Sequence, residues 1–108
     1  QRAVRTVRVG GAVRDYLIEL VTATRSHPAI RMGVSPRGTL ALQRAAQAHA
    51  AVAGRDFVLP DDVKAVCADV LAHRILCKGR SLTQGAEPAT AVLSQILAET
   101  RVPIESAE

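Results

Sequence analysis

Apolar positions recur with the period of an α-helix in four segments of the chain. The first segment covers residues 12–25, and its pattern ends before Pro28 because proline disfavours helical backbone in the residue that precedes it. Its recurring positions are Val13, Leu17, Leu20, Val21 and Thr24. The second begins at Ser35-Pro36, where serine can cap a helix and proline suits the first helical position, and it ends at Gly54. We therefore predict two helices joined by a loop.

A third helix is predicted to begin at Pro60. Asp61 and Asp62 fall in its first turn, where the helix dipole favours negative charge, and we expect His73 and Arg74 in its last turn, where positive charge is favoured. The apolar stripe of this helix consists of Val63, Val66, Cys67, Val70 and Leu71.

A fourth helix is predicted between Pro88 and Pro103. Its apolar face consists of Val92, Leu93, Ile96 and Leu97. Residues 78–87 contain two glycines and show no periodicity, which indicates a loop. Residues 7–9 alternate between apolar and polar and precede two glycines, which predicts a short extended segment and a turn. The pattern thus predicts an all-α domain of four helices, which can also contain two short strands.

The second helix has a polar side and a small, alanine-rich side. Gln43, Arg44 and Gln47 cluster on the polar side at 100° per residue. The opposite side, which we predict to be packed, holds Ala41, Leu42, Ala45, His49, Val52 and Ala53. Because His49 falls in the middle of this side, we expect a core histidine bonded to a backbone carbonyl rather than a metal ligand.

Composition narrows the possible functions. The 108 residues suffice for one domain with its own core, and 48% of them are hydrophobic. Tyr16 and Phe57 are the only aromatic residues, which excludes a stacking platform for single-stranded nucleic acid. The net charge of +4 is uneven, since residues 1–55 carry nine arginines and only two acidic residues. We interpret this half as a candidate surface for anions or acidic partners.

The sequence contains no motif for a metal site or a catalytic site of its own. The three histidines are too far apart in sequence to share a helical turn as zinc ligands do, and neither a catalytic triad motif nor a phosphate-binding glycine loop is present. Cys67 and Cys77 lack CxxC spacing, so we expect reduced thiols of a cytosolic protein, with Cys67 in the core. No apolar run reaches the length of a membrane span. We predict no metal site and no hydrolytic activity for this chain alone.

The start of the second helix carries the candidate functional residue. Arg37 lies in the first turn and shares a stripe with Leu40 and Arg44, away from the face that we expect to be packed. Such a stripe suits a partner with both apolar and anionic character. An ordinary solvated helix start is the alternative interpretation.

The sequence resembles the helical lid domain of MoxR-type AAA+ ATPases over about residues 4–103. The segments that carry the resemblance are Asp15-Tyr16-Leu17-Ile18, Ala23-Thr24-Arg25-Ser26-His27-Pro28, Gly33-Val34-Ser35-Pro36-Arg37, Ala45-Ala46, Gly54-Arg55-Asp56-Phe57-Val58, Pro60-Asp61-Asp62-Val63 and Val70-Leu71-Ala72-His73-Arg74. They occur in order and at family-like spacing.

The resemblance implies a function for Arg37. In that family the matching arginine is the sensor-2 residue, which reaches the γ-phosphate of ATP held by a neighbouring ATPase core. A planar, permanently charged guanidinium can bind phosphate oxygens at two points and stabilise the charge that develops during transfer. Arg37 is therefore expected to be catalytic, and Arg37, Ser35 and Leu40 to contact the nucleotide. The ATPase core, which binds ATP and Mg²⁺, would precede Gln1 in the parent protein, so we interpret the chain as a fragment.

The resemblance also implies an organisation and partners. Residues 1–10 would connect to the core, residues 11–103 would form the lid, and residues 104–108 would be a tail. The lid would close over ATP and couple its hydrolysis to chaperone-like remodelling or maturation of client proteins in the cytoplasm. Neighbouring subunits would complete a ring, expected to be a hexamer. The client and the role of residues 79–87 are not predicted.

Four local features depart from the family pattern. Val34 and Gly38 stand where alanine is usual, and Leu59 replaces a threonine cap. Gly10 and Gly11 replace a polar residue before the first helix. Glycine costs about 1 kcal/mol of helix propensity, so Gly38 is expected to loosen the turn that holds Arg37.

A free-standing basic module is the competing hypothesis. It would bind nucleic acid or an acidic protein through the N-terminal half. No helix is dense in Arg, Asn and Gln as a recognition helix would be, which disfavours nucleic acid.

Overall fold

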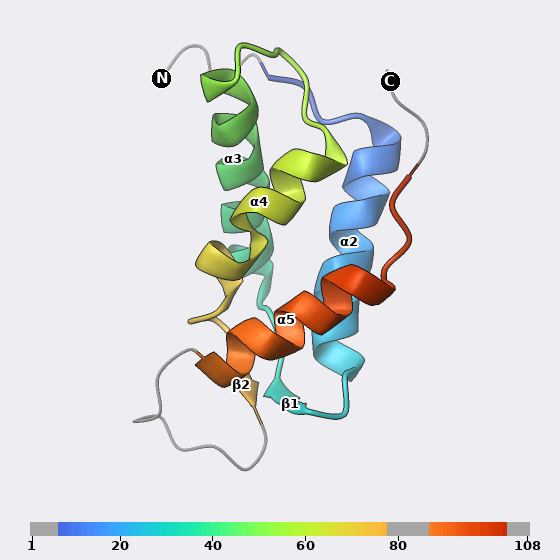
Figure 1. Cartoon of the computed structure of the whole chain (residues 1–108), viewed down its shortest axis with the longest axis vertical. Coiled ribbons are helices and arrows are strands. Elements are labelled where there is room, and N and C mark those ends of the chain that lie inside the picture. The colour runs from blue at the N-terminus through green and yellow to red at the C-terminus, as the bar shows by residue number, and fades with distance from the viewer. Residues whose placement is uncertain (1–6, 78–86, 104–108) are drawn as a thin grey trace.

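A computed structural model describes residues 7–77 and 87–103. Within these ranges the chain forms four helices and a two-stranded sheet (Figure 1). Their order is α2 (Gly11–Ser26), β1 (Ile30–Met32), α3 (Pro36–Val52), α4 (Pro60–Leu71), β2 (Leu76–Cys77) and α5 (Glu87–Glu99). The predicted all-α fold is confirmed. The structure does not describe residues 1–6, 78–86 and 104–108, so most of the loop predicted over residues 78–87 lies outside the described part. The last residue of that predicted loop, Glu87, instead belongs to α5.

The helices surround one apolar core. In Figure 1, α2 and α3 run in opposite directions on the two sides of the molecule, α4 lies between them, and α5 crosses in front of the lower part. All five predicted stripe positions of α2 are buried, and Tyr16 joins them with 2% of its surface exposed. Leu93 and Ile96 of α5 and Val63, Cys67 and Leu71 of α4 complete this core.

The buried side of α3 differs from the prediction. The residues buried there are Gly38, Leu42, Ala46 and Ala50, which follow one another at intervals of four. Val52 is 89% exposed, and His49 and Ala53 are also exposed, so three of the six predicted positions are wrong. The reason is that alanines occur all around this helix, and only the approach of α4 decides which of them are covered.

The predicted boundaries of α3 are confirmed. The Ser35 hydroxyl accepts a hydrogen bond from the Gly38 amide at 3.2 Å, and Pro36 occupies the first helical position. Gly54 follows the helix with a φ of 86°, a conformation that side chains rarely adopt.

The end of α4 requires a correction. The helix begins at Pro60 as predicted but ends at Leu71, so His73 and Arg74 follow it instead of lying in its last turn. Arg74 Nε still donates to the Val70 carbonyl at 3.0 Å. Arg74 therefore donates a hydrogen bond to a carbonyl of the last turn of α4 from outside the helix.

Two short strands are present among the described residues, and neither lies at residues 7–9. β1 and β2 pair antiparallel, with Ile30 opposite Cys77 and an irregular register toward Met32. The extended segment at Arg8 instead makes an isolated parallel bridge to Phe57.

Candidate functional site

The first turn of α3 is held by its own capping groups. Besides the bond between Ser35 and Gly38, the Thr39 hydroxyl donates to the Ser35 carbonyl at 3.1 Å. The Ser35 side chain thus satisfies one of the amides that a helix start leaves unpaired, and the Thr39 hydroxyl adds a second bond to a carbonyl that already accepts from the Thr39 amide. The turn that carries Arg37 therefore has a defined geometry.

The stripe predicted to face outward is exposed. Leu40 is 44% exposed, and Arg37 and Arg44 are exposed. Within the described part of the chain, no hydrogen bond or ion pair engages the Arg37 guanidinium. Arg37 is thus available to a partner, and its role in binding or catalysis stays a prediction, as do those of Ser35 and Leu40.

A groove of about 240 Å³ lies beside this helix start. It is lined by Ile18, Val21, Thr22, Arg25, Pro36 and Thr39. The pattern of the sequence did not indicate this groove, because its walls come from two helices, α2 from Ile18 onward and the first turn of α3. Only their contact in the fold brings these residues together.

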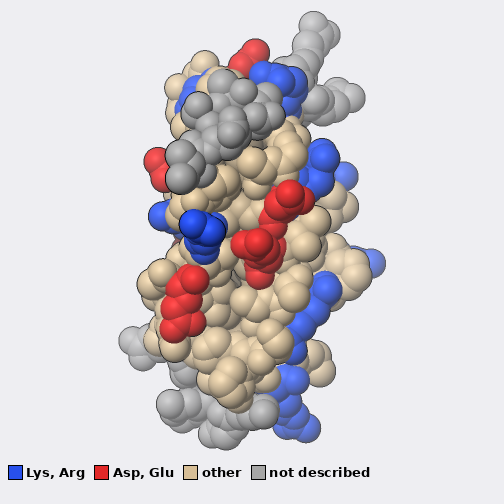
Figure 2. Space-filling model, turned by 90° about the vertical axis from the view of Figure 1, so that its right-hand side faces the viewer, with Lys and Arg blue, Asp and Glu red and all other residues tan. Residues whose placement is uncertain are grey.

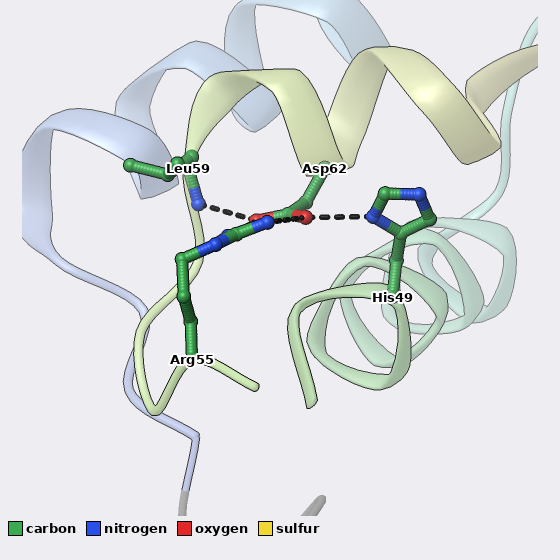
Figure 3. Close-up of polar contacts among 4 residues, drawn as sticks. All are labelled: His49, Arg55, Leu59 and Asp62. Atoms are coloured by element: carbon green, nitrogen blue, oxygen red, sulfur yellow. Dashed lines mark hydrogen bonds and ion pairs between the residues drawn. The ribbon is translucent and has the colours of Figure 1, made fainter. Parts of the chain in front are cut away.

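A buried carboxylate ties the end of α3 to the start of α4 (Figure 3). Asp62 is fully buried, and its two oxygens accept from Arg55 Nη1 and Nη2 at 2.7 and 2.9 Å. They also accept from the Leu59 amide at 2.7 Å and face His49 Nδ1 at 2.7 Å. Since an ionised carboxylate only accepts hydrogen bonds, His49 Nδ1 carries a proton in this arrangement.

The prediction of His49 as a core residue is wrong. Its side chain is 44% exposed and bonds to a carboxylate rather than to a backbone carbonyl. The sequence contained one signal for this cluster, because Asp62 is the third residue of a helix that begins with Pro60. An acidic side chain at that position can accept a hydrogen bond from the amide of the residue just before the helix. His49 and Arg55 could not be assigned to it from spacing.

The cysteines lie in apolar surroundings. Cys67 is 1% and Cys77 is 8% exposed, and both are free thiols. Burial raises the pKa of Cys67 to about 11, so the thiol stays protonated at neutral pH and is a poor nucleophile. The prediction of Cys67 as a core residue is confirmed.

Tyr16 combines burial with an unpartnered hydroxyl. Burial, together with the nearby Cys67 and Asp61, raises its pKa to about 12. Its hydroxyl has no hydrogen-bond partner among the described residues. The ring therefore contributes to the core, and its hydroxyl is not poised for acid–base chemistry at neutral pH.

Acidic and basic side chains share one face of the surface. Figure 2 shows acidic side chains near the middle of this face with a basic side chain beside them, and further basic side chains along one edge. Exposed Asp15 and Glu19 lie on α2, so the positive charge of the N-terminal half does not cover that helix. Among residues 7–77 and 87–103, no group of three or more His, Cys, Asp or Glu side chains could hold a metal, and no helix is long and apolar enough to cross a membrane.

Comparison with known proteins agrees with this architecture. Residues 22–96 match the family model described as AAA lid domain. The chain is 38% identical over 105 residues to "Uncharacterized protein YeaC" of Bacillus subtilis, covering 97% of this chain and 32% of that protein. It is 35% identical over 101 residues to "Chaperone MoxR1" of Mycobacterium tuberculosis, covering 85% of this chain and 26% of that protein.

A solved structure shares the fold. It is the crystal structure of "a putative ATPase" from Cytophaga hutchinsonii, with a TM-score of 0.81 and 31% sequence identity. The match covers 94% of this chain and 33% of that one, so this chain spans a third or less of the length of these three relatives. The chain belongs to the AAA lid domain family and is a lid of the MoxR type.

Proposed function

We propose that this domain is the lid of an ATPase in which Arg37 is the sensor-2 arginine. The lid closes over ATP bound to an ATPase core of the same protein, and Arg37 contacts the γ-phosphate. Ser35 and Leu40 lie beside Arg37 and contribute to the nucleotide contact. Lid movement couples hydrolysis to remodelling of client proteins within a ring of six subunits.

The exposure of Arg37 in a capped helix start is the observation that carries this proposal. Arg37 is solvent-exposed and lies in the first turn of α3, where the helix dipole favours negative charge. A phosphate group fits this chemistry, because guanidinium binds phosphate oxygens through two parallel hydrogen bonds. In this proposal Mg²⁺ is held by the core together with the phosphates of ATP.

The names of the relatives support the coupling to client proteins. One relative is called a chaperone, and a structural neighbour is called an ATPase. Since the lid has no phosphate-binding loop of its own, hydrolysis requires the core.

The test is Arg37→Ala in the protein that joins this lid to its ATPase core. If Arg37 stabilises the transferring phosphoryl group, kcat for ATP hydrolysis falls on the order of a hundredfold, since one charge-assisted donor is worth about 2.7 to 4 kcal/mol in a transition state. ADP binding changes less, because ADP lacks the γ-phosphate. Arg37→Lys restores only part of the rate, because an ammonium lacks the planar fork.

The matched control is Arg31→Ala, which removes an exposed arginine from β1. Its hydrolysis rate is expected to stay at the parental value. Parental hydrolysis by Arg37→Ala would refute the sensor assignment and would favour a role for Leu40 and Arg44 in docking a protein partner.

A further inference from the structure

Val34, in the loop before α3, is hydrogen-bonded to the last turn of α2 through both of its backbone polar groups. Its amide donates to Thr24 Oγ1 at 3.1 Å, and its carbonyl accepts from Arg25 Nε at 2.9 Å. Both backbone polar groups of Val34 are thus held by consecutive residues of one helix. Val34 lies one residue before the cap of α3 and three residues before Arg37.

The two contacts from α2 are themselves fixed. Thr24 is fully buried, and its hydroxyl donates to the Val21 carbonyl at 2.6 Å while it accepts from Val34. The hydroxyl therefore has no freedom to rotate without losing a bond in the interior, where an unpaired polar group is costly. Arg25 uses Nε for the Val34 carbonyl, and its side chain also lines the groove beside α3.

Close packing reinforces these hydrogen bonds. A Cβ atom on Gly33 would lie 2.8 Å from the Thr24 carbonyl oxygen and 2.9 Å from the Arg25 Cα atom. Any side chain at residue 33 would push the loop away from α2. On the other side, the Val34 side chain lies under the first turn of α3, within 2.8 Å of where a Cβ on Gly38 would stand. Val34 is thus fixed against α2 by its backbone and against α3 by its side chain.

We propose that Thr24 and Arg25 are positioning residues for Arg37. By holding the amide and the carbonyl of Val34, they set where α3 begins relative to α2 and hence where the Arg37 guanidinium can reach. The inference rests on the proposed sensor role of Arg37. The physical reason for a functional effect is that a displacement of about 1 Å in a catalytic group can cost up to a hundredfold in rate.

The test measures kcat and KM for ATP in the protein that joins this lid to its core. Thr24→Val keeps the shape of the side chain and removes the hydroxyl, and kcat is expected to fall on the order of tenfold with a smaller change in KM. Thr24→Ser keeps the hydroxyl and is expected to recover most of the rate. Thr100→Val is the matched control, because Thr100 directly follows α5 and its hydroxyl donates at 2.7 Å to the Ile96 carbonyl in the last turn of that helix, far along the sequence from Arg37.

Arg25→Met provides a second variant that does not disturb a fully buried site. It keeps an unbranched side chain, removes the bond to the Val34 carbonyl and is expected to lower kcat in the same way. Arg14→Met is its control, since Arg14 is an exposed arginine on the same helix that donates to the Val9 carbonyl. Should Thr24→Val fail to fold, Arg25→Met alone still decides the result.

The deciding measurement repeats both substitutions in an Arg37→Ala background. If Thr24 and Arg25 act through Arg37, their effects on kcat shrink to less than twofold there, because the group that they position is gone. Equal losses of kcat in both backgrounds, or no loss in the parental background, would overturn the positioning role while leaving the sensor role intact. An Arg37→Ala protein that hydrolyses ATP at the parental rate would overturn both.

Discussion

At the scale of single residues, Asp62 shows how one buried charge can be accommodated. A carboxylate without partners would be costly to bury, but Asp62 accepts from a bidentate guanidinium, an imidazole and a backbone amide. Arg55 and His49 keep 25% and 44% of their side chains exposed, so their own desolvation is incomplete. The cluster therefore joins α3, the following loop and α4 at a moderate cost.

Asp62→Asn is expected to destabilise the isolated chain by about 3 kcal/mol, because it leaves several donors facing a neutral amide. The measurement is urea unfolding followed by circular dichroism. Asp61→Asn is the control, since Asp61 lies in the same helical turn but is exposed, and its effect is expected to be small. Equal effects of the two substitutions would show that the buried network contributes nothing beyond helix-dipole charge.

At the scale of the element, the start of α3 explains two departures from the family pattern together. Val34 is larger than the usual alanine and Gly38 is smaller, and the structure places them in contact, with Val34 Cγ1 2.8 Å from the position of a Cβ on residue 38. Gly38 is also buried. Gly38 thus leaves space for the Val34 side chain. This contact explains why a glycine stands in a helix despite its low helix propensity.

Gly38→Ala and Val34→Ala are expected to compensate each other. Gly38→Ala gains about 1 kcal/mol of helix propensity but overpacks the site, for a net loss of about 1 kcal/mol. Val34→Ala leaves a cavity and costs about 2 kcal/mol. The double variant is expected to be more stable than the sum predicts by at least about 1 kcal/mol in urea unfolding. Additive losses would mean that the two residues do not share space.

The start of α4 shows a second compensation within one element. Leu59 cannot cap the helix with its side chain, which alone would cost around 1 kcal/mol. Asp62 nevertheless accepts from the Leu59 amide at 2.7 Å, and the Asp62 amide donates to the Leu59 carbonyl at 2.9 Å. The acid that forms the ion pair with Arg55 therefore also closes the first turn.

At the scale of the whole molecule, the four described helices bury one another's apolar faces. α4 packs along α3, and α5 contacts both α2 and α4. A domain whose helices cover their own apolar stripes does not need a second chain to fold.

We therefore expect the isolated chain to be a monomeric, mostly helical domain without ATPase activity. Far-ultraviolet circular dichroism, size-exclusion chromatography and a phosphate-release assay test the three parts. A spectrum dominated by coil or strand would contradict the fold. Turnover of ATP by a pure sample would mean that a catalytic site has been overlooked.

The sequence by itself determined where α3 begins and ends, where α4 begins and which side of α2 is buried. Ser35-Pro36, Gly54 and Pro60 act through local backbone geometry, so their effect does not depend on distant residues. The α2 stripe contrasts apolar with polar positions strongly enough to define one face. The exposure of Arg37 followed from the helical periodicity of α3, which places it on a stripe with Leu40 and Arg44.

Only the tertiary structure decided which side of α3 is covered and which polar groups meet. The alanines of α3 are nearly equivalent in polarity, so burial of Ala46 and Ala50 and exposure of Ala53 depend on where α4 packs. The hydrogen bonds that His49 and Arg55 make with Asp62, and those that Val34 makes with Thr24 and Arg25, join two helices or a loop and a helix. Periodicity describes one helix at a time, whereas these contacts depend on how two elements are oriented in space.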